Sequence, residues 1–155
     1  MLSRAERLLD EGRYQEALEH FESGNDLRSV FGRGVALQLL GRFDEAEEAY
    51  ETVLAADPAH QETLANLLAM SVEDFDLKAV ERYAKRLLDL DSTSAIALRG
   101  LIVVAVERHD YEFAAICFAK LTLRDEHFRD AIEYRLSRQI VDRLKDIHGQ
   151  VAHTY

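Results

Sequence analysis

The fold is decided by one ten-residue segment, Gly41-Arg42-Phe43-Asp44-Glu45-Ala46-Glu47-Glu48-Ala49-Tyr50. It reads as a turn residue, a polar residue, an aromatic residue, two variable positions, a small residue, three further positions and a second aromatic residue. The same order occurs at residues 12–21 and 109–118, and a weaker copy covers residues 74–83. This recurrence indicates that the chain is built from repeats.

The small residue of each copy gives the repeat length. It falls at Ala17, Ala46, Ala79 and Ala114, with intervals of 29, 33 and 35 residues. These intervals bracket the ~34-residue repeat of a helix, a turn and a second helix. A small residue on the second helix lets it approach the first, and the aromatic residue one turn later fills the gap between them. The spacing therefore predicts pairs of antiparallel helices.

The turn residue of each copy lies where the first helix must end and the chain must reverse. Gly12 and Gly41 suit this place because glycine adopts positive φ without steric cost. Asp74 and His109 occupy it in the later copies, and both residue types are enriched in the left-handed region. We therefore expect positive φ at all four positions.

Apolar periodicity predicts nine helices. They cover about residues 2–11, 14–22, 27–40, 43–56, 59–72, 76–90, 93–107, 110–123 and 125–148. The last has an apolar stripe every four residues with a charged back, formed by Phe128, Ile132, Leu136, Ile140 and Leu144. Because the end of a stack of repeats exposes an unpaired apolar face, we expect helix 125–148 to cap the stack. The alternative is that it docks on another molecule.

The second copy, with its flanking residues, resembles the tetratricopeptide-repeat (TPR) family. The matching positions are Val30, Gly34, Leu37, Gly41, Ala46, Tyr50, Val53, Leu54 and Pro58. Asp57 is expected to N-cap the next helix, with Pro58 in its first turn. The resemblance implies an all-α, right-handed α-solenoid of antiparallel helix pairs, one domain over residues 1–155. Its four repeats would cover about 2–24, 27–58, 59–92 and 93–123, followed by the capping helix.

In that family the first helix of each pair lines a concave groove, which commonly holds a peptide or a helix. The resemblance therefore implies groove positions in the second, third and fourth repeats. They are Arg28, Phe31, Val35, Gln38, Leu39, Glu62, Ala65, Asn66, Ala69, Glu73, Ile96, Arg99, Val103 and Val106. This groove is largely apolar. Members of the family that clamp a C-terminal carboxylate use Lys and Asn side chains, whereas only Arg28, Asn66 and Arg99 could contribute here. The pattern argues against that binding mode.

Composition and charge exclude several functional classes. A net charge of −10 argues against nucleic acid as a partner. No run approaches the ~18 apolar residues that span a bilayer, so we expect no membrane insertion. The N-terminus has no signal-peptide pattern, and the single cysteine suits a reducing compartment, so we expect a cytoplasmic protein. Ten acids and no Lys or Arg lie between Phe43 and Leu77. They form either a solvated face or a strip that steers a basic partner.

Residues that could support catalysis or metal binding are scattered. The six histidines include no pair at the helical spacing that zinc sites use, and no Gly-rich phosphate-binding phrase occurs. Cys117 lies beside Phe118 of the repeat, where a buried, inert thiol is expected. The sequence predicts no enzyme, no cofactor and no metal.

Two functional hypotheses remain. The first is an adaptor, scaffold or assembly factor that receives a peptide or an amphipathic helix in the apolar groove. The second is a structural module that forms homo-oligomers through residues 95–106 or through helix 125–148. The segment 95–106 is apolar on nearly every side, so something should cover it. The cover would be the last helix, a second copy of the chain, a partner helix, or simply the neighbouring repeats.

Overall fold

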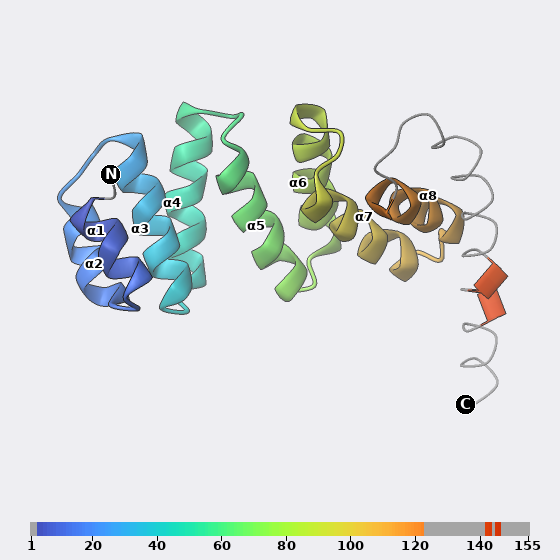
Figure 1. Cartoon of the computed structure of the whole chain (residues 1–155), viewed down its shortest axis with the longest axis horizontal. Coiled ribbons are helices and arrows are strands. Elements are labelled where there is room, and N and C mark those ends of the chain that lie inside the picture. Colours follow the sequence, from blue (N-terminus) through green and yellow to red (C-terminus); the bar gives the residue numbers. More distant parts are fainter. Residues whose placement is uncertain (1–2, 123–141, 144, 147–155) are drawn as a thin grey trace. The chain divides into compact units, whose positions relative to one another are not determined.

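The protein is seen in a computed structural model that describes residues 3–122, 142, 143, 145 and 146. Residues 3–122 form eight helices and no strand, and residues 142, 143, 145 and 146 are also helical, which confirms the all-α prediction (Figure 1). The helices are α1 (Arg4–Asp10), α2 (Tyr14–Glu22), α3 (Leu27–Leu39), α4 (Phe43–Ala56), α5 (Gln61–Glu73), α6 (Leu77–Leu90), α7 (Ala95–Glu107) and α8 (Tyr111–Thr122). Each begins and ends within two residues of its prediction. The ninth predicted helix, 125–148, lies largely outside the described residues, and its capping role stays a prediction.

The chain divides into two compact units, Met1–Met70 and Ser71–Tyr155, with the boundary inside α5. In the first unit α1 packs on α2, α2 on α3 and α3 on α4. In the second unit α6 packs on α7 and α7 on α8. Within each unit, the predicted solenoid-type packing of consecutive helices is confirmed. The hand of the stack and the single-domain organisation stay predictions.

Two glycines of α3 let aromatic side chains of neighbouring helices approach its backbone. Phe21 of α2 lies against Gly32, and Tyr50 of α4 lies against Gly34. A Cβ atom at either glycine would stand less than 3 Å from a ring carbon, at 2.3 Å and 2.6 Å respectively. Tyr50 is completely buried. The small residues of the repeat therefore allow the helices of the first unit to pack closely.

In the second unit α7 is partly covered by α6 and α8. Its buried residues are Ala97, Leu98, Gly100, Leu101, Val104 and Ala105. Ile96 remains 36% exposed, so the neighbouring described helices cover only part of the apolar segment 95–106. On α8, Phe113, Ile116 and Phe118 are also exposed. The expectation that the second aromatic of each copy fills the gap between helices is wrong for Phe118, which is 43% exposed.

All four turns between the helices of a pair share one geometry. The positive-φ residues are Gly12, Gly41, Phe75 and His109. In each turn the N–H of this residue donates to the carbonyl three positions back, and the next N–H donates to the carbonyl five positions back. This pair of backbone hydrogen bonds is typical of the end of a helix. Three of the four predicted positions are confirmed.

The third turn differs from its prediction by one residue. Positive φ falls on Phe75, at 58°, and not on Asp74. The turn residues Gly41, Phe75 and His109 are therefore 34 positions apart. In this register the small position of the third copy is held by Val80, which is completely buried, and not by Ala79. The prediction was wrong because it aligned residue types, whereas the hydrogen bonds of the turn fix the register.

Replacing Phe75 by glycine should stabilise the second unit by about 1 kcal/mol. A left-handed conformation costs an L-residue roughly 1–2 kcal/mol, which glycine avoids at some cost in chain entropy. Phe75 is 58% exposed, so little buried contact is lost. Urea unfolding would measure the change. Phe75→Ala keeps the strained left-handed backbone conformation and should bring no comparable gain in stability. Asp74→Gly is the control that tests which residue holds the positive-φ position of the turn. A larger gain from Asp74→Gly than from Phe75→Gly would contradict the assigned turn.

Candidate functional site

A buried tyrosine joins two of the predicted groove residues in the first unit. The Tyr50 hydroxyl donates a hydrogen bond of 2.7 Å to the side-chain carbonyl of Gln38 on α3. It also accepts a bond of 3.1 Å from the side-chain amide of Asn66 on α5. Burial raises the pKa of Tyr50 to about 12, so the hydroxyl stays protonated and remains a donor at neutral pH. One hydroxyl of α4 thus brings amides of α3 and α5 together.

The start of α5 is fixed beside these residues by His60. Its Nδ1 accepts a hydrogen bond of 3.2 Å from the backbone N–H of Thr63 and lies 2.8 Å from the Thr63 hydroxyl. Its ring lies 5.0 Å from the ring of Phe31 on α3. The expected N-cap, Asp57, instead accepts from the backbone N–H of Ala59. The prediction was wrong because α5 begins only at Gln61, and the intervening turn uses the Asp57 carboxylate.

The predicted groove residues of the first unit are all accessible to solvent. None is buried, whereas Val30, Ala36 and Leu37 on the same α3 are. We call this set the α3/α5 face. It consists of Arg28, Phe31, Val35, Gln38, Leu39, Glu62, Ala65, Asn66 and Ala69. Leu39 is its most accessible large apolar side chain, at 48% exposed.

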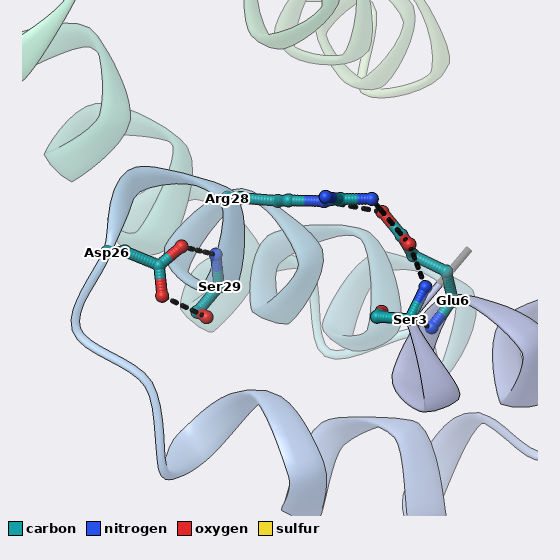
Figure 2. A network of polar contacts seen from close by, with 5 residues as sticks. All are labelled: Ser3, Glu6, Asp26, Arg28 and Ser29. Carbon is teal, nitrogen blue, oxygen red and sulfur yellow. Dashed lines mark hydrogen bonds and ion pairs between the residues drawn. The ribbon is translucent and has the colours of Figure 1, made fainter. Parts of the chain in front are cut away.

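Arg28, the cation of this face, is paired within the chain (Figure 2). Its Nε and Nη2 atoms donate to the two carboxylate oxygens of Glu6 on α1, at 2.8 and 2.7 Å. The same carboxylate accepts from the backbone N–H of Ser3, which caps α1. The Ser3 N–H and the Arg28 guanidinium hold the pKa of Glu6 below its usual range. Arg28 is therefore occupied by an internal carboxylate, and the pair ties α1 to α3.

The remaining predicted groove residues lie in the second unit. Glu73, Ile96 and Arg99 are exposed, while Val103 and Val106 are half-buried. Their membership of one groove with the α3/α5 face stays a prediction. Sequence reasoning missed the roles of the Tyr50 hydroxyl and of His60. The repeat offers one signal for His60, because Ser94, 34 residues later, caps α7 in the same way.

Acidic residues line an open hollow on α4. It measures about 690 Å³ and is bordered by Asp44, Glu47, Glu48, Glu51 and Thr52. The four acids among them belong to the acidic strip found in the sequence. In the part of the chain that the structure describes, no group of three or more His, Cys, Asp or Glu residues could hold a metal ion.

Cys117 is buried, as predicted, and burial raises the pKa of its thiol. A thiol in this state carries little thiolate at neutral pH and is a poor nucleophile. The surroundings of Cys117 therefore do not resemble those of a catalytic cysteine.

Comparison with known proteins agrees with the repeat found in the sequence. Residues 28–60 match the family model of the tetratricopeptide repeat. This segment contains nearly all of α3, the whole of α4 and the turn that leads to α5. The comparison with curated proteins gave no match. None of the helices described, over residues 3–122, is long and apolar enough to cross a membrane. The pair formed by α3 and α4 is thus similar to one tetratricopeptide repeat, a kind of repeat that generally serves protein–protein interaction.

Proposed function

We propose that the chain is a non-catalytic, cytoplasmic adaptor, scaffold or assembly factor that binds a peptide or an amphipathic helix on its α3/α5 face. The observation that carries the proposal is the exposure of Leu39 beside the half-buried Val35 and Gln38. An apolar side chain on such a surface, next to polar groups that can orient a ligand, is typical of a recognition site.

The charges of the face favour a neutral or basic partner. Glu62 is exposed on α5, and Arg28 is paired with Glu6. A partner with a terminal carboxylate would have to displace Glu6 from Arg28, and it would meet repulsion from the net charge of −10. The acidic hollow on α4 would add attraction for a basic partner. Weaker capture at high salt is the expected sign of this steering.

Replacing Leu39 by glutamate should lower partner affinity at least tenfold, because a charge would enter a contact that partner binding removes from water. The partner is captured from a lysate of the source cells, identified by mass spectrometry and purified. Its affinity for both proteins is then measured by calorimetry. Phe31 is unsuited to this test because its ring lies 6.0 Å from that of Tyr50 and packs on the core of α3 and α4.

The matched control is Phe43→Glu, which changes a 43% exposed side chain in the first turn of α4. A negative charge is favourable in the first turn of a helix, so this variant should fold normally and keep full affinity. Equal affinity of Leu39→Glu and wild type would refute the assignment of the face.

The second candidate function is self-assembly through the second unit. It is favoured by the exposed apolar residues Ile96, Phe113 and Ile116 on α7 and α8. If it holds, sedimentation equilibrium should show a dimer or larger species at micromolar concentration, and Ile116→Glu should shift it to monomer. A monomer for wild type at the highest soluble concentration would exclude this alternative.

A further inference from the structure

The exposed face of α8 is apolar at its centre and charged at both ends. Phe113 and Ile116 are 40% and 39% exposed, although α8 packs on α7. Glu112 in the first turn and Lys120 in the last turn are exposed as well. Because residues three and four apart lie together on a helix, these four side chains share one side of it, which we call the α8 face. An apolar centre with a charged rim is typical of contacts between proteins.

The charges of the α8 face are arranged to meet a second copy of the same face. Glu112 lies four residues before Ile116, and Lys120 lies four residues after it. Where two antiparallel helices meet at Ile116, the equal rise per residue brings Glu112 of one copy level with Lys120 of the other. A two-fold axis repeats this opposition at the other end of the contact. The α8 face is therefore complementary in charge to an antiparallel copy of itself.

The same charges disfavour a parallel arrangement of the two helices. Two parallel copies that met at Ile116 would place Glu112 beside Glu112 and Lys120 beside Lys120, and like charges placed together in an interface repel. In the antiparallel arrangement the aliphatic part of Lys120 would also lie near the Phe113 ring of the other copy, since their levels differ by one residue. A carboxylate accepts several hydrogen bonds, so Glu112 can bond to that lysine alongside contacts in its own chain.

We propose that the chain forms a two-fold homodimer in which the α8 helices of two copies pack antiparallel and meet at Ile116. The inference rests on the second candidate function, self-assembly through the second unit. It adds the arrangement of the contact and the charges that select it, and it uses no residue of the α3/α5 face. A helix of 12 residues spans about 18 Å, so the contact is small and the dissociation constant should be on the order of micromolar.

The test changes the charges at the two ends of the α8 face in the full chain. Lys120→Glu puts carboxylates at both ends, and Glu112→Lys puts ammonium groups at both ends. In sedimentation equilibrium each variant alone should dimerise about tenfold more weakly than wild type, because two attractive oppositions become repulsive. An equimolar mixture of the two variants restores both attractions and should dimerise as wild type does. The double variant Glu112→Lys/Lys120→Glu should do the same, and this recovery would show that neither change unfolds α8.

The matched control for net charge is Lys78→Glu. It makes the same change of charge as Lys120→Glu, at an exposed position in the first turn of α6, where a negative charge is favourable. This variant should dimerise as strongly as wild type. An equal loss from Lys78→Glu and Lys120→Glu would overturn the inference, because the effect would then follow the net charge of the chain and not the α8 face.

The outcomes separate the inference from the function on which it rests. A wild-type dimer that neither single variant weakens overturns the antiparallel α8 contact and leaves self-assembly in place. A wild-type chain that stays monomeric at its highest soluble concentration overturns both, and the α8 face would then be covered by the residues that follow α8 or by another protein. Neither result bears on the α3/α5 face, which the Leu39→Glu variant tests.

Discussion

Replacing Tyr50 by alanine should lower the free energy of unfolding of the first unit by about 3–5 kcal/mol, the cost typical of deleting a buried aromatic ring. The ring is completely buried between α3 and α4, lies 6.0 Å from the ring of Phe31, and carries the hydroxyl bonded to Gln38 and Asn66. Its loss would leave a cavity beside Gly34. Urea unfolding followed by circular dichroism, with hydrogen exchange to assign the loss to α3 and α4, would measure the effect.

Tyr50→Phe is the matched control, because it keeps the ring and removes only the hydroxyl. Gln38 and Asn66 are half-buried and can bond to water instead, so we expect a cost of about 1 kcal/mol. If Tyr50→Ala cost no more than Tyr50→Phe, the ring could not be the centre of this core.

Replacing Gly34 by alanine should destabilise the first unit by about 1–3 kcal/mol, although helix propensity alone predicts a gain of about 1 kcal/mol. The added Cβ would stand 2.6 Å from the Cε1 atom of Tyr50. Because the ring is completely buried, it cannot move aside without disturbing the packing of α3 on α4. Thermal unfolding of the variant beside wild type would give the sign of the change directly.

A double-mutant cycle isolates the steric cause. Combining Gly34→Ala with Tyr50→Leu removes the ring that the new methyl group would meet. The two changes together should then cost less than the sum of the single changes. Additive effects, or a Gly34→Ala variant more stable than wild type, would show that the glycine is not needed for close packing.

Local sequence patterns predicted the helices because the residues that start and end a helix lie close together in the sequence. The turn signals Gly12 and Gly41 placed α2 and α4 at their observed bounds. The α5 boundary was less accurate, because histidine is not among the usual N-cap residues and Asp57 offered a better local match. At Phe75 the local chemistry pointed to a neighbouring residue, since a bulky side chain seldom adopts positive φ.

The candidate site was predicted only in outline. The repeat register placed Val35, Gln38 and Leu39 on one accessible face, because residues three and four apart lie together on a helix. Pattern alone could not show that Arg28 is occupied by Glu6, a residue 22 positions away. The prediction from sequence counted Arg28 among the groove residues that could contact a partner.

The sequence by itself determined the all-α class, the helix bounds and the repeat, because hydrophobic spacing and turn residues act over one or two helical turns. Only the tertiary structure decided the register of the third turn, the occupation of Arg28 and the link from Gln38 through Tyr50 to Asn66. The register of the third turn is fixed by the backbone hydrogen bonds of that turn. The other two features join side chains of different helices. Which side chains come into contact depends on how closely the helices approach one another. That approach depends on Gly32 and Gly34, which lie opposite two aromatic rings.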